Sequence, residues 1–479
     1  MKMFIGGQQV DSSDGKTIAV LNSATQEHLD TVPSATVADI ERALNIASEG
    51  KLKWAAMPQY ERSRILQRCA DLIDIHQEEL AQHLSTEMGK IIREARPEIA
   101  CSAQIFRGFA EAANHLYGKS MPNYQYGSEN DLIFTRYQPL GVVACISPFN
   151  YPAELCAHKM ASALAAGNAV IVKPATDNPL IILKLIELCL EAGVPGDVLQ
   201  CVTGSGAIIG DYLARSDKVD AITLTGSTEV GVSVAKAAAT TLKHISLELG
   251  GNDPFIVYED ADMDLAVEEA VRGRVQNSGQ TCCAPKRFLV QNTVKAEFVE
   301  KVLARIKLVK RGSPLDDNTD LGSMISVRAA QTAEQQVKQT VAQGAKLLCG
   351  GYSFDGSYFE PTVLDDVTLD MDIAKDLEVF GPVMPVIEFD TMDNAIKIAN
   401  ATCFGLQAGV MTKDNNKAFQ TAMALECGSV CINASGNFRN VDQPFGGWKM
   451  SGLGREGISV TLKELSQEKS FVLKGVLKP

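Results

Sequence analysis

The segment from Gln276 to Lys286, with the sequence QNSGQTCCAPK, contains the best candidate for a nucleophile, Cys282. Cysteine attacks a carbonyl carbon as the thiolate, and a thiol with an ordinary pKa of about 8.5 is only a few per cent ionised at neutral pH. Taken alone, Cys282 and Cys283 are more simply interpreted as small buried hydrophobic residues, which is the usual role of free cysteines. A catalytic role therefore depends on support from the rest of the chain.

Glu248 is the corresponding candidate for a general base. It ends a strand-like run in the sequence LELGG, between Leu247 and Leu249. A carboxylate at the end of a strand is commonly solvated or ion-paired, but burial among apolar side chains would raise its pKa toward neutrality, where it can activate water. The six histidines all lie at or before His244, so a histidine could pair with Cys282 only through long-range folding.

The elements that must position these residues begin at Gly141, where apolar runs start to alternate with helix-like stretches of about 10–15 residues. This alternation predicts a parallel sheet with helices on both faces, which binds ligands at the carboxyl ends of its strands. Residues capable of chemistry follow these strands, with Asn150 after the first and Lys173 at the end of the second. The expected strands are residues 142–146, 169–173, 198–202, 221–224 and 244–249.

Two glycine-rich turns follow the third and fourth of these strands. The first, TGSGAIIG, contains Gly206, and the second, TGSTEVG, contains Gly226 and Ser227. Such turns at the start of a helix present backbone N–H groups and the positive end of the helix dipole to a phosphate. One such turn is weak support, because tight strand-to-helix turns need glycine in any case, but two in one sheet favour a phosphate-bearing ligand.

Helical and α/β patterns flank this sheet. Residues 37–88 and 93–117 show helical periodicity and carry no signal of chemistry. A second α/β region follows the sheet, with an expected strand at 254–258, a helix at 263–275 and a strand at 287–291. The turn that holds the candidate nucleophile lies between this helix and the last of these strands.

Composition limits the partners. The 479 residues carry a formal net charge of −13, which argues against nucleic acid or an anionic membrane surface as a partner. No apolar run is long enough to span a membrane, and the N-terminus lacks the features of a signal peptide. The twelve cysteines form no CxxC motif and no Cys/His cluster with metal-binding spacing, so we expect no metal site and a cytoplasmic protein with reduced thiols.

Nine segments together resemble the aldehyde dehydrogenase superfamily, and the resemblance covers essentially the whole chain. In order, they are SPFNYP, KPA, TGS, LTGSTEVG, LELGG, NSGQTC, EVFGPV, FGLQAGV and PFGGWKMSGLGRE. The resemblance implies an α/β fold with a Rossmann-like parallel-sheet cofactor domain, a second α/β catalytic domain and a small β arm for oligomerisation. The implied cofactor domain is 1–118 and 138–249 with 441–459 returning to it, the catalytic domain is 250–440, and the arm is 119–137 and 460–479.

The resemblance also implies an enzyme that oxidises a small aldehyde to the carboxylic acid with NAD or NADP. In it, Cys282 forms a thiohemiacetal and then a thioester, Glu248 activates the water that hydrolyses the thioester, and Asn150 is an oxyanion donor. Two alternatives are a CoA-acylating relative, which generally lacks a glutamate at the position of Glu248, and a non-catalytic binding protein on the same fold. The presence of all three residues favours the hydrolytic enzyme.

For the coenzyme, the resemblance assigns Lys173 to the adenosine ribose, Ser227 to the pyrophosphate and Glu378 to the nicotinamide ribose. The other implied coenzyme contacts are Ser147, Pro148, Phe149, Thr176, Gly206, Gly226 and Phe380. Thr176 occupies the place where NAD-preferring relatives often hold a glutamate that repels the 2′-phosphate of NADP. We therefore expect NADP to be accepted.

For the substrate, the resemblance implies contacts from Arg107, His158, Thr281 and Arg439. Relatives that oxidise succinic semialdehyde typically carry arginines at the places held here by His158 and Gln276. The motifs are closer to branches that act on lactaldehyde, glyceraldehyde 3-phosphate, a semialdehyde or another short anionic aldehyde. We expect Arg107, His158 and Arg439 to converge as a cationic mouth at the nucleophile, and the chain to form a homodimer or homotetramer.

Overall fold

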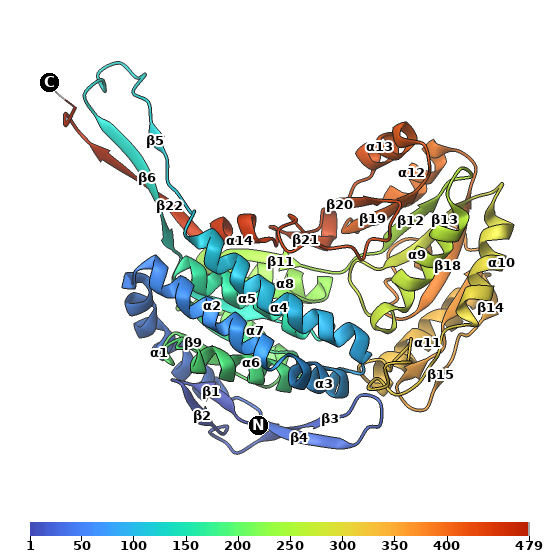
Figure 1. Cartoon of the computed structure of the whole chain (residues 1–479), viewed down its shortest axis with the longest axis horizontal. Helices are drawn as coiled ribbons and strands as arrows, with labels where there is room; N and C mark the ends of the chain where they lie inside the picture. Colours follow the sequence, from blue (N-terminus) through green and yellow to red (C-terminus); the bar gives the residue numbers. More distant parts are fainter. Residues whose placement is uncertain (478–479) are drawn as a thin grey trace.

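The computed structural model describes residues 1–477 and contains two α/β bodies and a slender β arm (Figure 1). Each body is built on one large sheet, and the arm projects from the body that contains the N-terminus. Residues 478–479, which end the predicted arm, lie outside the described residues. Within residues 1–477, no helix combines the length and the apolar character needed to cross a membrane.

The first body is organised around an eight-stranded sheet. In sheet order its strands are β2 (Gln8–Val10), β1 (Met3–Ile5), β9 (Leu199–Cys201), β8 (Ala169–Lys173), β7 (Val142–Ile146), β10 (Ala221–Thr225), β11 (His244–Glu248) and β21 (Gly452–Leu453). The central strands β9 to β11 are parallel, and β7 and β8 are buried along their whole length, as expected for apolar strands in a covered parallel sheet. Short antiparallel strands lie at both edges, and β21 brings a segment near the C-terminus beside the end of β11.

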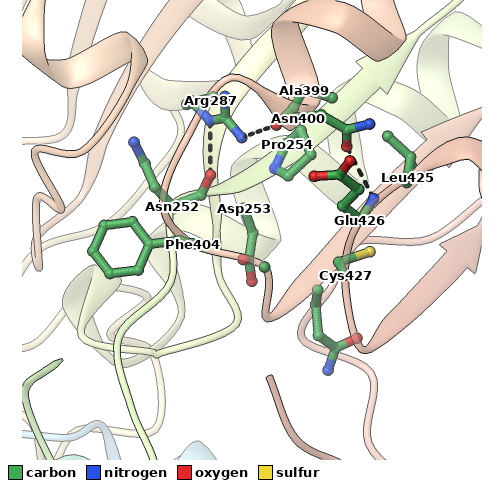
Figure 2. A pocket seen from close by; sticks show the side chains of 12 residues that line it. Asn252, Asp253, Pro254, Arg287, Ala399, Asn400, Phe404, Leu425, Glu426 and Cys427 are labelled. Carbon is green, nitrogen blue, oxygen red and sulfur yellow. Dashed lines mark hydrogen bonds between the residues drawn. The ribbon is translucent and has the colours of Figure 1, made fainter. Parts of the chain in front are cut away.

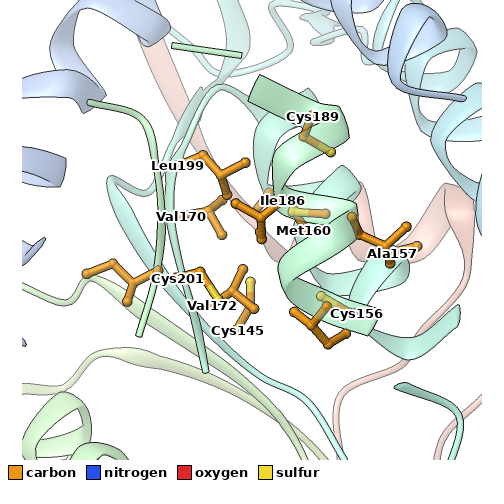
Figure 3. Close-up of a cluster of buried hydrophobic side chains, with 14 of the residues drawn as sticks. Cys145, Cys156, Ala157, Met160, Val170, Val172, Ile186, Cys189, Leu199 and Cys201 are labelled. Atoms are coloured by element: carbon orange, nitrogen blue, oxygen red, sulfur yellow. The ribbon is translucent and has the colours of Figure 1, made fainter. Parts of the chain in front are cut away.

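Helices pack against this sheet and enclose an apolar core. They are α1 (Val37–Ala56), α2 (Gln59–Ile75), α3 (Gln77–Met88), α4 (Ile92–Ala113), α5 (Pro152–Ala166), α6 (Leu180–Glu191), α7 (Gly206–Arg215), α8 (Thr228–Ala238) and α14 (Ile458–Glu464). Figure 3 shows the core between β7 to β9 and the helices α5 and α6, where Cys145 and Cys201 lie among apolar side chains such as Met160 and Ile186. Cysteines of this region therefore serve as packing residues.

The long helix α4 ends at Ala113, before the expected limit at residue 117. Nδ2 of Asn114 donates to the carbonyl oxygen of Ala110 at 3.1 Å and so takes up an acceptor of the last helical turn. Asparagine side chains compete with the backbone for hydrogen bonds in this way, which explains the earlier end of the helix.

The second body contains a seven-stranded sheet. In sheet order its strands are β14 (Lys346–Cys349), β17 (Thr362–Asp365), β18 (Val383–Phe389), β13 (Pro285–Gln291), β12 (Asp253–Val257), β19 (Gln407–Met411) and β20 (Ser429–Ile432). Neighbouring strands are parallel except β14 and β17. The helices of this body are α9 (Met263–Val275), α10 (Lys295–Ile306), α11 (Val327–Ala342), α12 (Met392–Asn400) and α13 (Asn415–Ala424). The expected limits of α9 are confirmed, and its end leads into the turn of the candidate nucleophile.

The arm consists of three antiparallel strands, β22 (Ser466–Leu473), β6 (Leu132–Pro139) and β5 (Ser120–Met121). The rings of Phe134 and Phe471 stack across β6 and β22 with their centroids 5.0 Å apart. Two further pairs of strands are β3 (Thr17–Leu21) with β4 (His28–Pro33), and β15 (Ser353–Phe354) with β16 (Tyr358–Phe359). In the arm, β6 thus pairs with the C-terminal strand β22 over the whole length of β22.

Candidate active site

Cys282 lies between α9 and β13 in a tight turn that specific side chains hold. Asn277 adopts a left-handed backbone conformation with φ of 51°. Nε2 of Gln280 donates to the carbonyl oxygen of Asn277 at 3.1 Å. Lys286, which is buried, donates from Nζ to the carbonyl oxygen of Cys282. The position of Cys282 therefore depends on side chains of its own loop and on one buried lysine.

The thiol of Cys282 needs a proton acceptor. Its hydrogen bond to Cys283 and its burial raise the pKa of Cys282 well above the usual value, whereas the positive charges of Lys286 and Arg439 lower it. Cys283 is itself buried and packs against Phe445. In this arrangement the thiol is protonated at neutral pH, and attack on a carbonyl carbon requires loss of that proton.

Asn150 is buried in the loop after β7, with 3% of its surface exposed. Its main-chain carbonyl oxygen accepts hydrogen bonds from Nζ of Lys90 and from Nδ2 of Asn277, each at 2.9 Å. Its side-chain oxygen has no hydrogen-bond partner within residues 1–477. The bond from Asn277 joins the loop of Asn150 to the loop of Cys282, so the two loops form one site.

Glu248 is buried at the end of β11, between the two buried leucines of the LELGG segment. Neither of its carboxylate oxygens has a hydrogen-bond partner in the described part of the chain. Burial raises the pKa of Glu248 well above the usual value, negative charge on Cys282 and Glu456 adds to this rise, and Arg439 and Lys159 oppose it. A carboxyl group with a raised pKa is suited to accept a proton from water or from a thiol.

A cavity of about 1050 Å³ connects Cys282 and Asn150 to the carboxyl ends of the strands of the first sheet. Both bodies contribute to its lining, the first through strand ends and helix starts and the second through Gln280, the first half of α11 and neighbouring loops. Every residue that the resemblance assigns to the coenzyme lines it, namely Ser147, Pro148, Phe149, Lys173, Thr176, Gly206, Gly226, Ser227, Glu378 and Phe380. Its volume is at the upper end of the usual range for ligand pockets, which suits a large ligand.

The chemistry of the first body's lining fits a dinucleotide. α7 and α8 both begin at the cavity, and helix N-termini favour phosphate groups. Ser227 caps α8 and accepts a hydrogen bond from the N–H of Val230 at 3.4 Å. A Cβ atom at Gly206 would lie 3.4 Å from Nζ of Lys173, which places the first turn of α7 directly beside the lysine. Burial lowers the pKa of Lys173 to about 8, against the opposing effect of Asp177.

The second body contributes a carboxylate and an aromatic ring to the same cavity. Glu378 accepts a hydrogen bond from the N–H of Gly251 at 3.2 Å and forms an ion pair with Lys286 at 3.1 Å. The ring of Phe380 meets that of Phe149 edge to face, with centroids 5.8 Å apart. A carboxylate suits ribose hydroxyl groups and an aromatic ring suits a planar base, so this side also fits a dinucleotide.

Arg439 and Thr281 do not line this cavity, but Thr281 directly precedes Cys282 in the chain and the charge of Arg439 acts on the Cys282 thiol. Nη2 of Arg439 donates to Oε2 of Glu456 at 2.9 Å, and Nε of Arg439 is buried without a hydrogen-bond partner among residues 1–477. The hydroxyl oxygen of Thr281 lies 3.3 Å from that of Tyr151. One donor of the Arg439 guanidinium group is therefore left unpaired within the described part of the protein.

The expectation of a cationic mouth formed by three residues is corrected for Arg107 and His158. Arg107 of α4 has a partly exposed side chain that forms ion pairs with two residues of α2, Asp71 at 2.9 Å and Asp74 at 2.6 Å. His158 is fully buried within α5, with its ring centroid 6.0 Å from that of Phe109. Burial lowers the pKa of His158 to about 3, so its ring is neutral at physiological pH. Neither residue lines the cavity or offers it an unpaired positive charge, because Arg107 is paired with two carboxylates and His158 is neutral.

Sequence reasoning did not identify several buried charged residues that contact the site. Lys286 holds the carbonyl group of Cys282, and Glu456 holds Arg439. Both lie inside glycine-containing segments that the sequence had singled out, so proximity to a motif could have indicated them. Lys90, which contacts the loop of Asn150, lies in the short linker between α3 and α4, which carries no such signal.

A second pocket, of about 10 Å³, lies in the second body and is lined by the segments 252–254, 399–400 and 425–427 (Figure 2). Arg287 donates from Nε to the carbonyl oxygen of residue 252 and from Nη2 to that of residue 399, each at 2.7 Å. A volume of this size cannot hold an aldehyde. The arginine therefore ties these loops together, and the pocket has a structural role.

Comparison with known proteins places these features in context. The model of the family described as "Aldehyde dehydrogenase family" matches residues 10–471. A glutarate-semialdehyde dehydrogenase of Pseudomonas putida is 41% identical over 454 residues, which are 95% of this chain and 94% of that protein. A 3-sulfolactaldehyde dehydrogenase of Priestia aryabhattai is 38% identical over 98% of this chain and 97% of its own length. The crystal structure of betaine aldehyde dehydrogenase from Staphylococcus aureus in complex with NAD⁺ superposes with a TM-score of 0.96 at 33% identity, covering 100% of this chain and 95% of that one.

Proposed function

The chain belongs to the aldehyde dehydrogenase family and oxidises small aldehydes to carboxylic acids with NAD(P), and on this premise we propose that Cys282, Glu248 and Asn150 act on a short anionic aldehyde. The observation that carries the proposal is the cavity in which Cys282 and Asn150 meet a lining suited to a dinucleotide. Lys173, Ser227 and the other lining residues would hold NAD(P). When bound, this coenzyme accepts the hydride that the aldehyde carbon releases.

In the proposed first step, the thiolate of Cys282 adds to the aldehyde carbon. Lys286 and Arg439 favour the thiolate through their positive charges. The oxygen becomes an oxyanion, which the side-chain amide of Asn150 and the backbone N–H of Cys282 stabilise. One donor of this kind is worth roughly 3–4 kcal/mol in the transition state.

Loss of hydride from the adduct to bound coenzyme would leave a thioester at Cys282. In the proposed second step, Glu248 removes a proton from water, and the resulting hydroxide attacks this thioester. The acid leaves and the thiolate is restored. The raised pKa of Glu248 suits this role, because it makes the carboxylate a stronger base than that of an ordinary glutamate. The presence of this glutamate also favours water over coenzyme A as the acceptor of the acyl group.

We propose that the chain forms homodimers or homotetramers through the arm, residues 119–137 and 460–479. The arm ends in an outer strand, β5, and carries the exposed aromatic residues Tyr124 and Tyr126. We further propose the division into a cofactor domain, 1–118 and 138–249 with 441–459, and a catalytic domain, 250–440, which follows the two large sheets. A cytoplasmic location agrees with free cysteines throughout the described chain.

The substrate proposal rests on Arg439 and on what the relatives act on. Relatives named for glutarate semialdehyde, succinate semialdehyde and 3-sulfolactaldehyde all act on aldehydes with an acidic group at the other end. The unpartnered Nε of Arg439 provides a charge-assisted donor near Cys282 for such a group. Arg439 also pairs with Glu456, so its charge is partly compensated in the free enzyme.

A kinetic screen tests the proposed function. Succinic and glutaric semialdehydes, 3-sulfolactaldehyde, lactaldehyde, glyceraldehyde 3-phosphate and propanal are compared with NAD and NADP, and with coenzyme A present or absent. We expect Cys282→Ala to lower turnover by at least about 10⁴-fold, as loss of a nucleophile does in other enzymes. Cys283→Ala should retain most of the activity, because Cys283 packs against its neighbours. Inactivation by Cys283→Ala alone would place the nucleophile one residue later.

Arg439→Ala tests the substrate class. We expect this variant to raise KM for an anionic aldehyde by about tenfold or more, which corresponds to the loss of one charge-assisted contact worth about 1.5–3 kcal/mol. KM for propanal should change little. Equal effects on both substrates would show that Arg439 holds its loop through Glu456 and would remove the support for an anionic substrate.

A further inference from the structure

A buried ion pair behind Asn150 has no part in the chemistry described above. Lys90 lies between α3 and α4, and its fully buried side chain forms an ion pair with Glu98 of α4. Nζ of Lys90 also donates to the carbonyl oxygen of Asn150 at 2.9 Å and lies 3.6 Å from the ring centroid of Tyr151. The ammonium group thus meets an anion, a carbonyl oxygen and an aromatic face, which together replace its hydration.

Glu98 anchors the other end of the same loop. One of its carboxylate oxygens accepts hydrogen bonds from the N–H of Ala153 at 3.0 Å and from that of Glu154 at 3.4 Å, at the start of α5. The N-terminus of a helix favours a negative charge at this place. The loop is therefore held at two points, at Asn150 by the lysine and at the first turn of α5 by the carboxylate.

The loop of Cys282 meets the same carbonyl group. Nδ2 of Asn277 donates to the carbonyl oxygen of Asn150 at 2.9 Å, and the N–H of Asn277 donates to Oε2 of Glu94 at 2.8 Å. Glu94 and Glu98 are four residues apart on α4, which places them on one face of the helix. One helix face therefore supports both loops of the site.

We propose that Lys90, paired with Glu98, is a positioning residue that fixes the orientation of Asn150 as an oxyanion donor; this inference rests on the proposed function, in which Asn150 stabilises the oxyanion. The side-chain oxygen of Asn150 has no hydrogen-bond partner within residues 1–477, so its amide takes its direction from the main chain. Lys90 holds that main chain at the carbonyl group. Apolar residues often replace a buried ion pair without loss of stability, so we attribute this pair to positioning.

The test combines Lys90→Met and Asn150→Ala in the full-length enzyme. One measurement is the rate of the initial burst of NAD(P)H with an accepted aldehyde. The other is the rate of Cys282 alkylation by iodoacetamide, a displacement that forms no oxyanion. We expect Asn150→Ala to lower the burst rate by about 10²–10³-fold, the usual effect of losing an oxyanion donor. Lys90→Met should lower it about tenfold, as a small misplacement of a catalytic group does, and leave alkylation within about twofold.

The double variant Lys90→Met/Asn150→Ala separates positioning from other roles. If Lys90 acts through the amide of Asn150, removing Lys90 after the amide is gone should lower the burst rate by less than about twofold, because residues that act through one another are not additive. Three results would each overturn the inference. Lys90→Met could lower the burst rate and the alkylation rate equally, it could lower the burst rate as much in the Asn150→Ala background as in the wild-type enzyme, or it could leave the burst rate unchanged. Retention of the wild-type burst rate by Asn150→Ala would instead reject the proposed function.

Two further variants keep the test decisive. Lys90→Met leaves the carboxylate of Glu98 buried without its partner, which destabilises a fold. Lys90→Met/Glu98→Gln removes both charges and keeps an oxygen that can accept from the first turn of α5, and it should show the same loss of about tenfold. Lys53→Met is the matched control, because Lys53 forms an exposed ion pair with Asp197, and it should retain the wild-type burst rate.

Discussion

The loops that carry Asn150 and Cys282 are held in the same way and lie in different surroundings. In each loop a buried lysine donates to the main-chain carbonyl oxygen, Lys90 to that of Asn150 and Lys286 to that of Cys282. A strong hydrogen bond from a charged donor to a carbonyl oxygen fixes the plane of that peptide bond. It therefore also fixes the direction of the chemical groups on either side of the bond. The protein thus uses one arrangement twice, once for each proposed donor to the oxyanion.

The carboxylates that neutralise the two lysines differ in exposure. The side chain of Glu98 is 1% exposed and is bound to the start of α5, whereas that of Glu378 is 21% exposed and lines the coenzyme cavity. Because the partners of Glu98 all belong to the protein, we interpret the loop of Asn150 as a fixed part of the site. Glu378 faces the place proposed for the coenzyme, so the loop of Cys282 is the one that can respond to coenzyme binding.

Of three variants that test this comparison, Glu248→Gln has the largest expected effect. It separates thioester formation, which both loops serve, from the hydrolysis of the thioester that follows. We expect a burst of about one NAD(P)H per active site and then a steady-state rate lowered by about 10²–10⁴-fold, since the thioester forms but is not hydrolysed. Stopped-flow absorbance measures both phases. A burst slowed as much as turnover would assign Glu248 to activation of the thiol, and unimpaired turnover would reject both roles.

The raised pKa of Glu248 also predicts how the steady-state rates of the wild-type enzyme and of Glu248→Gln depend on pH. The carboxylate is the active base, and its population increases as the pH rises through that raised pKa. The steady-state rate of the wild-type enzyme should therefore rise with pH over this range. Glutamine does not titrate, so the variant should lack this rise.

Lys286→Met is expected to have an intermediate effect and distinguishes the two loops directly. The charge of Lys286 lowers the pKa of Cys282, so its removal should move the pH profile of iodoacetamide alkylation to higher pH. Lys90→Met should leave the profile in place, because Lys90 contacts the loop of Asn150. Equal shifts of the alkylation profile in Lys90→Met and Lys286→Met would show that the two lysines do not act on separate loops.

Thr176→Glu belongs to neither loop and has the smallest expected effect on the reaction itself. Thr176 lines the cavity and donates from its hydroxyl group to the carbonyl oxygen of Gly204 at 3.1 Å. A carboxylate here would repel the 2′-phosphate of NADP, so KM for NADP should rise about tenfold while that for NAD stays within about twofold. Initial rates with each coenzyme measure this. A wild-type preference for NAD of about a hundredfold, or about 2.7 kcal/mol, would contradict the expected acceptance of NADP.

Local sequence patterns predicted much of the framework. The expected limits of β7, β8 and α9 are those of the structure, because an apolar strand or an amphipathic helix is encoded by neighbouring residues. Residues expected at the coenzyme site follow strands of one parallel sheet, and the topology of such a sheet brings its strand ends to one edge. Resemblance supplied the individual roles, which the proposed variants test.

The charged contacts around the site could not be predicted from local patterns. Lys90 lies 60 residues from Asn150 in the sequence, and Lys286 lies 92 residues from Glu378, so only the tertiary structure joins them. It also buried His158 in a neutral form, without the positive charge expected for a cationic mouth. A strand or helix forms from the periodicity of its own residues, but a charge can be buried only where distant segments supply the partners that replace its water. The sequence by itself therefore determined the elements and the strand ends that carry the motifs, while the tertiary structure decided which charged residues hold those motifs in place.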